Sequence, residues 1–110
     1  MNRIKLTTAI IFILCISIGS IANAASSGER YKQNGMNKYM RKNYAGAVVD
    51  FDKYLAINPS DVSVIFLRGL SKSLLKPEDV IGACADFLVV KPHVKDLNMD
   101  KYCAGQAGWQ

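Results

Sequence analysis

The chain has 110 residues, of which 50% are hydrophobic, and its formal net charge is +5. A chain of this length forms a single small domain. Its cations are spread along the sequence, so we do not expect the clustered basic surface that binds nucleic acid.

Residues 1–24 have the layout of a cleavable secretory signal peptide. Arg3 and Lys5 precede an apolar run at residues 9–18, and the small-residue motif Ala22-Asn23-Ala24 follows it. We expect cleavage after this motif, which would place the mature protein in the periplasm or outside the cell.

Two other interpretations of this segment are disfavoured. A membrane anchor is disfavoured because Ser17, Gly19 and Ser20 interrupt the apolar stretch, which is shorter than the roughly 20 residues that a bilayer requires. A lipoprotein is disfavoured because Leu14 precedes Cys15, whereas lipid-attachment sites carry a small residue there. We therefore expect no stable membrane insertion after cleavage.

Cleavage would leave 86 residues with 12 basic and 9 acidic side chains, so the excess charge falls to +3. A domain this small usually needs a covalent or metal staple. Cys84 and Cys103 are the two cysteines that remain, in a compartment that permits oxidation. We therefore predict a disulfide between them.

The first half of the mature chain predicts two helices. After a lead-in at 25–29, where Ser26 and Glu29 have capping-box spacing, a helix is expected over 27–41. A second is expected over 44–57, with Asn43 as its N-cap. Asp50, Asp52 and Lys53 are predicted to form its solvated face. Apolar spacing predicts the inner faces, which are Tyr31, Gly35 and Tyr39, with Met36 and Met40 beside them, then Tyr44, Ala47, Val48, Phe51, Tyr54 and Leu55.

Two further helices are predicted after Pro59, which prevents continuation of the second. Ser60 or Asp61 can start the third helix, expected over 61–75, and Pro77 suits the first position of the fourth, expected to end near Val90. Their predicted inner faces are Ile65, Phe66, Gly69, Leu70, Ser73 and Leu74, and then Val80, Ala83, Cys84, Phe87 and Leu88.

The end of the chain gives a weaker pattern. A short fifth helix is expected over 94–103, with Val94, Leu97 and Tyr102 as its sizeable apolar groups. Residues 104–110 contain two glycines and no apolar period, so we expect a flexible tail despite Trp109.

The two helix pairs share an internal repeat, because Gly35 and Gly69 are 34 residues apart and each lies midway along the first helix of its pair. This is the period of the tetratricopeptide repeat. The first unit resembles that family at six positions, and the second agrees at three. These signature residues are Tyr31, Gly35, Tyr44, Ala47, Phe51 and Pro59, then Gly69, Ala83 and Phe87. Gly35 and Ala47 are expected to be small because the helices of one pair cross closely there, whereas Tyr44 and Phe51 are expected to fill the space between pairs.

The resemblance implies an all-α fold, a short α-solenoid over residues 30–103. Its repeats would span about 28–61 and 62–92, with a capping helix at 93–103. The spacing from Gly69 to Ala83 is two residues longer than that from Gly35 to Ala47, so a longer turn is expected at 76–79. Many exported bacterial members of the family also place one cysteine in the final repeat and another near the chain end, as Cys84 and Cys103 are placed here.

In this family the first helix of each pair lines a concave groove that holds a peptide or a partner's helix. Carried over to this chain, the groove residues are Lys32, Met36, Tyr39, Phe66, Leu70 and Ser73. Aromatic and methionine side chains suit a partly apolar ligand. Met36, Phe66 and Leu70 could equally be packed between helices. The groove lacks the Lys and Asn set with which some members clamp a C-terminal carboxylate.

No catalytic, metal-binding or cofactor-binding motif is evident. His93 is the only histidine and has no ligand at metal-binding spacing, and Asp50 and Asp52 point to different sides of a helix. The cysteine pair lacks C-x-x-C spacing, which favours a structural bridge over redox activity.

The sequence therefore predicts an exported protein that binds another protein or peptide, as an adaptor or assembly factor of an envelope or secretion complex, and not an enzyme. A secreted effector or structural protein remains an alternative, and so does a thiol-redox protein. Partner identity and oligomeric state are left open.

Overall fold

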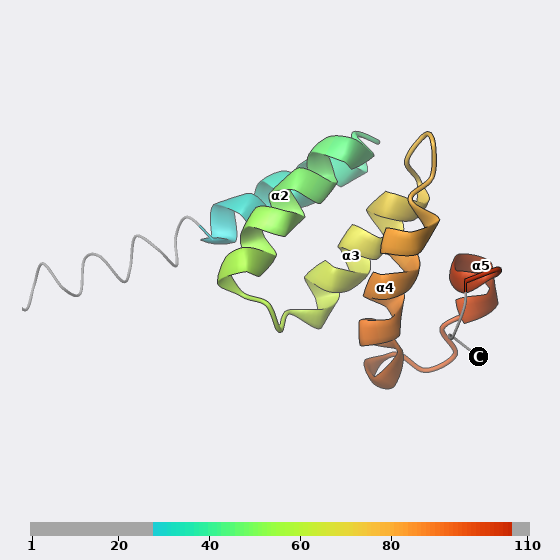
Figure 1. Ribbon diagram of the computed structural model, residues 1–110. Coiled ribbons are helices and arrows are strands. Elements are labelled where there is room, and N and C mark those ends of the chain that lie inside the picture. Colours follow the sequence, from blue (N-terminus) through green and yellow to red (C-terminus); the bar gives the residue numbers. More distant parts are fainter. Residues whose placement is uncertain (1–27, 107–110) are drawn as a thin grey trace, which may run out of the picture.

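A computed structural model describes residues 28–106 (Figure 1). Within this range every regular element is a helix, and the all-α prediction is confirmed. The predicted signal peptide, the capping residue Ser26 and Trp109 lie outside the described residues, as do 25–27 and the rest of 107–110. No described helix is long and apolar enough to cross a membrane.

The first helix runs over residues 28–40, and α2 (Tyr44–Ile57) returns beside it. Lys42 ends the first helix in the left-handed conformation at φ 63°, and the amide of Asn43 donates to the Lys38 carbonyl. The Asn43 side chain then accepts a hydrogen bond from the Gly46 amide, as predicted for the cap of α2. The bounds of α2 agree with the prediction at both ends.

The second pair consists of α3 (Val62–Ser73) and α4 (Val80–Val90). Asp61 caps α3, as expected, but α3 ends at Ser73 and not at residue 75. The predicted start of α4 at Pro77 is wrong. Asp79 accepts a hydrogen bond from the Gly82 amide and so serves as the N-cap, which leaves Pro77 in the preceding turn.

The C-terminal part is less helical than predicted. A 3₁₀ turn, η1 (Lys91–His93), follows α4, and α5 spans only Met99–Cys103. Val94 is exposed, while Leu97 is half-buried and Met99 is buried. Asn98 caps α5 by accepting from the Lys101 amide, which explains the late start of the helix.

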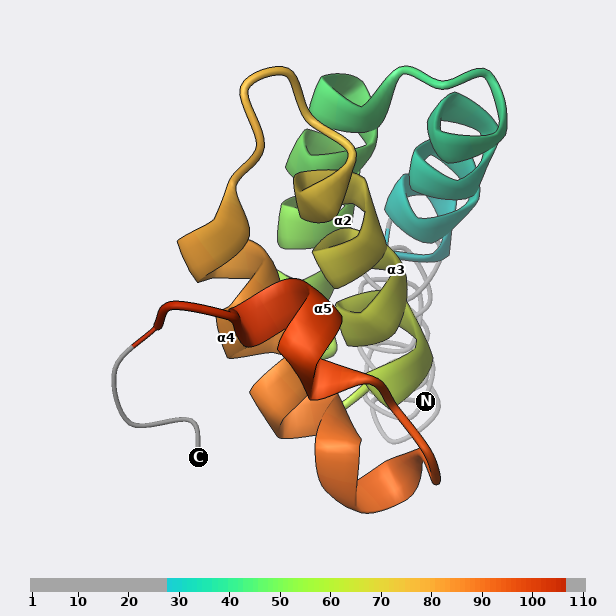
Figure 2. The ribbon, with the colours of Figure 1, turned by 90° about the vertical axis from the view of Figure 1, so that its right-hand side faces the viewer.

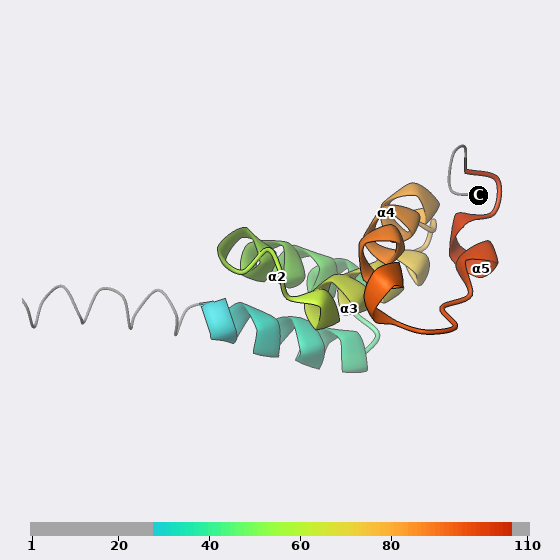
Figure 3. The same ribbon diagram turned by 90° about the horizontal axis from the view of Figure 1, so that it is seen from below.

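The helices stack in chain order, from the first helix and α2 through α3 and α4 to α5 (Figure 1). Seen from the α5 end, α5 lies in front of α3 and α4 (Figure 2), and the view from below shows the first helix running beside α2 (Figure 3). Cys84 of α4 is bonded to Cys103 of α5, with the sulfur atoms 2.03 Å apart. The predicted disulfide therefore joins the last helix to the second pair.

The core has two parts. One lies between α2 and α3 and includes Phe51, Tyr54 and Val64; the other lies between α4 and α5 and includes Phe87 and Met99. Phe66 packs against both parts.

The inner faces of α3 and α4 differ from the prediction in several places. Leu74, Val80 and Leu88 were expected inside, but they are 41%, 36% and 42% exposed. Leu74 lies beyond the end of α3, and α4 is apolar on nearly every side, so periodicity could not orient it. The residues of α4 that are buried are Ala83, Cys84, Asp86, Phe87 and Val90.

Candidate functional site

Both helix pairs are closed by the same contact between a glycine and a phenylalanine. A Cβ atom at Gly35 would lie 2.6 Å from the Phe51 ring, and one at Gly69 would lie 3.1 Å from the Phe87 ring. The glycines therefore allow the close helix approach that was predicted. The group that Gly35 meets is the Phe51 ring of its own pair, and the same ring belongs to the core cluster that includes Val64 and Ile65 of α3.

Each pair also contains a buried carboxylate that contacts a lysine of the neighbouring helix. Lys38 Nζ lies 2.7 Å from Asp50 Oδ2, and Lys72 Nζ lies 3.1 Å from Asp86 Oδ2. Asp50 is only 5% exposed and Asp86 only 4%. The prediction that Asp50 belongs to a solvated face is therefore wrong, because its buried carboxylate forms an ion pair with a lysine of the first helix.

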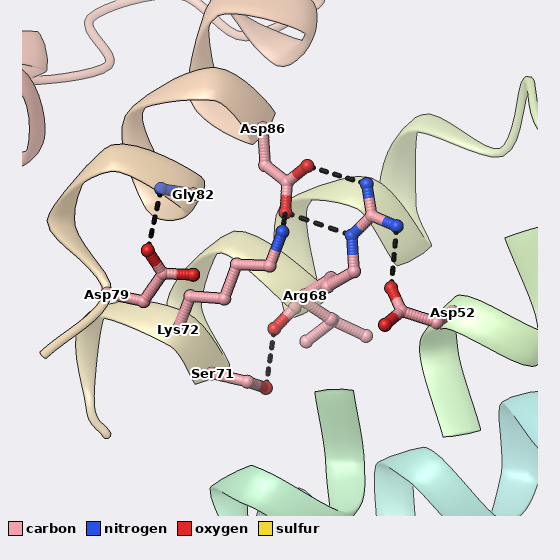
Figure 4. Close-up of polar contacts among 8 residues, drawn as sticks. Asp52, Arg68, Ser71, Lys72, Asp79, Gly82 and Asp86 are labelled. Carbon is pink, nitrogen blue, oxygen red and sulfur yellow. Dashed lines mark hydrogen bonds and ion pairs between the residues drawn. The ribbon is translucent and has the colours of Figure 1, made fainter. Parts of the chain in front are cut away.

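Arg68 joins the two pairs through a network of charges (Figure 4). Its Nε and Nη2 atoms donate to the two carboxylate oxygens of Asp86 at 3.0 and 2.7 Å, while Nη1 donates to Asp52 at 2.8 Å. The hydrogen bonds to Asp86 raise the pKa of the Arg68 guanidinium above its ordinary value, although burial opposes this. Asp52 remains exposed, as predicted, but it holds α2 against α3.

A second junction between the pairs is built on Asp61, the N-cap of α3. Tyr54 Oη donates to Asp61 Oδ2 at 2.7 Å, and Lys32 Nζ donates to the same oxygen at 3.3 Å. Burial acts to raise the pKa of Asp61, but the hydrogen bonds from Ser63, Tyr54, Lys32 and the Val64 amide outweigh it and hold that pKa well below its usual range. The carboxylate is therefore charged throughout the physiological range.

The expected groove residues on the first helix have different environments. Lys32 is engaged by Asp61 and also lies 5.4 Å from the centre of the Tyr54 ring. Tyr39 packs against the core, with its ring 5.6 Å from that of Tyr44. Met36 is 37% exposed, so it is available to a partner.

The expected groove residues on α3 lie beside α5. Phe66 is packed edge-on against Phe87, with their ring centres 5.7 Å apart. Leu70 and Ser73 line an open cleft of about 370 Å³ between α3 and α5. The cleft is completed by four residues that the sequence did not place in the groove, which are Leu74, Glu78, Lys101 and Tyr102.

Three of the remaining signature residues are packed inside the fold, and Pro59 is not. Ala47 and Ala83 are buried, at 0% and 1% exposure, and Tyr31 packs against the first core cluster. Pro59 is exposed in the turn between α2 and α3.

The histidine and the cysteines of the described residues do not belong to a cluster of metal ligands. His93 is exposed, and no group of three or more potential metal ligands occurs among residues 28–106. The cysteines are 4% and 0% exposed, which shields the disulfide from attack by a thiolate in solution.

The buried aspartates were not predicted from the sequence, although a signal for them was present. The motif Gly-Ala-x-x-Asp-Phe occurs at 46–51 and again at 82–87, with a capping Asn43 or Asp79 three residues before each glycine. The matching lysines, Lys38 and Lys72, are 34 residues apart, like the two glycines. Asp50 and Asp86 stand at the same place in the two copies of this motif. This recurrence would have indicated that the two aspartates occupy equivalent positions in the structure.

The fold and the cleft define a class, namely a disulfide-bonded all-α protein made of two similar helix pairs and a short terminal helix. No model of a protein family matches the chain, and neither a curated protein nor a solved structure matches it.

Proposed function

We propose that this protein is an exported tetratricopeptide-type adaptor that binds a segment of another protein in the cleft between α3 and α5. The two pairs share the glycine–phenylalanine contact, the capped second helix and the contact between a lysine and a buried aspartate. Stacking of similar helix pairs is typical of repeat proteins, which use the extended surface of the stack to bind partners.

The cleft is the observation that carries this proposal. Leu70, Leu74 and Tyr102 give it an apolar wall, and Glu78 and Lys101 supply a charge of each sign at its edge. A volume of about 370 Å³ is at the low end for ligand sites. It suits one anchoring apolar side chain of a partner, surrounded by polar contacts.

The first helix offers a second apolar contact for such a partner. Met36 is 37% exposed and Met40 is 78% exposed. Methionine side chains adapt to ligands of different shape, and exposed methionines are common at binding surfaces. A peptide or helix from the partner would thus be held by adaptable apolar contacts and anchored in the cleft.

A binding role is favoured over thiol chemistry because both sulfur atoms are buried. The signal-like N-terminus supports a role in the periplasm or outside the cell, in the assembly of an envelope or secretion complex.

Site-specific photo-crosslinking tests this proposal. A photoreactive residue at Ser73, inside the cleft, should capture a defined partner when the full chain is expressed with its own leader in a bacterium that exports it. The matched control places the same residue at Val49, which is 51% exposed on the outer side of α2.

The captured product should also disappear when Leu70→Glu is added to the Ser73 variant, because a buried carboxylate would oppose an apolar anchor. Thermal melting of the Leu70→Glu protein checks that it remains folded. Identical products from the two labelled positions, or no product from Ser73, would rule out the cleft as the binding site.

A further inference from the structure

The outer side of α4 carries an apolar stripe that no other described element covers. Ile81 is 71% exposed, Val89 54% and Leu88 42%, and Ala85 is also exposed. These residues recur at the helical spacing i, i+4, i+7 and i+8, so they form one continuous face. It is directed away from the buried residues Ala83, Phe87 and Val90, and it is distinct from the cleft.

Comparison of the two helix pairs shows that this stripe is particular to α4. With the repeated motifs at 46–51 and 82–87 aligned, Leu88 and Val89 correspond to Asp52 and Lys53 of α2. These two positions are therefore charged on α2, where Asp52 also bonds to Arg68 of α3, and apolar on α4. Packing inside the pair does not require apolar groups at these two positions, because α2 carries charged residues there. The other two stripe positions correspond to Ala45 and Val49 of α2.

We propose that the α4 stripe is a self-association surface on which a second copy of this chain docks its own α4 in antiparallel orientation. A two-fold axis at Ala85 would place this small residue at the helix crossing, where it permits close approach. Ile81 of each copy would then meet Val89 of the other, because they lie four residues on either side of Ala85.

Charge at the two ends of α4 favours a second copy. Glu78 and Asp79 precede the helix and Lys91 follows it, so an antiparallel partner brings basic and acidic ends together at both edges of the contact. The opposed helix dipoles act in the same direction. A membrane surface fits less well, because lipid-binding helices are flanked by Lys and Arg, whereas two acids lie at the N-terminal end of this stripe.

The stripe is short, so the dimer should be weak. Four exposed side chains per copy correspond to an interface below about 1,200 Å² in total, the range of transient contacts. We expect a dissociation constant on the order of 100 μM, with monomer dominant at low micromolar concentration.

Sedimentation equilibrium of the mature, oxidised protein from about 10 μM to 1 mM tests the proposal. The wild type should move from monomer to dimer across this range. Ile81→Glu and, independently, Val89→Glu should each raise the dissociation constant at least about tenfold, because each places a carboxylate in the apolar contact. Val49→Glu, at the position on α2 that corresponds to Ala85, should leave it unchanged.

Lys91→Glu tests the orientation. It should weaken the dimer about threefold or more, because it places an acid beside the acidic end of the other copy. A monomer at all concentrations would overturn the proposal, as would a dimer insensitive to Ile81→Glu and Val89→Glu. If the protein stayed monomeric and bound phosphatidylglycerol vesicles through the stripe, the proposal would be overturned in favour of a lipid partner. If Lys91→Glu associated as tightly as the wild type or more tightly, the antiparallel arrangement would be overturned.

Discussion

Replacement of Gly35 by alanine should destabilise the protein, although glycine within a helix is normally improved by that change. The helix itself would gain about 0.5–1 kcal/mol. The added methyl group, however, would lie 2.6 and 2.7 Å from two atoms of the Phe51 ring. Phe51 has 0% exposure, so its ring cannot move without disturbing the core.

Overpacking of this kind typically costs 1–3 kcal/mol. We therefore expect Gly35→Ala to lower the free energy of unfolding by about 1–2 kcal/mol, which corresponds to a fall in Tm of roughly 5–10 °C for a domain of this size. Gly69→Ala should be milder, because its methyl group would lie 3.1 Å from Asp86 and Phe87.

Gly28→Ala is the matched control. A Cβ atom there would be 3.5 Å from Asn58 and Ile57, an ordinary contact distance. This variant should be neutral or more stable by up to about 1 kcal/mol. Urea and thermal unfolding of the oxidised proteins measure all three changes. If Gly35→Ala were as stable as Gly28→Ala, the close approach of the first helix to Phe51 would be wrong.

Three further predictions concern charges and the disulfide. Asp86→Asn removes the counter-charge of two partly buried cations and should lower the free energy of unfolding by about 2–3 kcal/mol. Asp52→Asn, at an exposed site, should change it by less than about 1 kcal/mol. Equal effects of the two variants in urea unfolding would contradict the role of the charge network. The folded-state pKa of Asp61 lies below its ordinary value, so its charge stabilises the fold above about pH 4 and this contribution is lost as the pH falls below that. Asp61→Asn, which can still cap the helix, should therefore be less stable than wild type at pH 7 and closer to it at pH 3, and a difference independent of pH would refute the role of the charge. Reduction of the Cys84–Cys103 bond, which spans 19 residues, should lower the free energy of unfolding by about 3 kcal/mol and unfold the C-terminal third. Superimposable melting curves with and without reductant would reject this stabilising role of the disulfide.

The bounds of a helix could be predicted from the sequence where a favourable N-cap residue precedes the helix and a proline follows it. The bounds of α2 could be predicted because Asn43 is a good N-cap and Pro59 prevents extension. The start of α4 was misplaced because Pro77 and Asp79 are both acceptable starting residues, and only the hydrogen bond from the Gly82 amide decides between them.

Burial was harder to predict where it depends on partners from another helix. Asp50 has the spacing of a solvated residue on its own helix, and only the approach of Lys38 makes its burial tolerable. Two of the six residues that line the cleft, Leu70 and Ser73, are among the groove residues implied by the family resemblance. Lys101 and Tyr102 reach the cleft from α5, whose position depends on the disulfide and on Met99.

The covalent closure at α5 makes the two ends of the stack unequal. In a linear array each helix is stabilised mainly by its nearest neighbours. At one end a short helix is bonded to α4; at the other, among the described residues, the first helix rests on α2 and on the contact between Lys32 and Asp61. Transient opening of the helix pairs should therefore begin at the first helix, and its amide protons should exchange faster than those of α2, α3 and α4. Met36 and Met40 would thus lie on the most adaptable of these four helices.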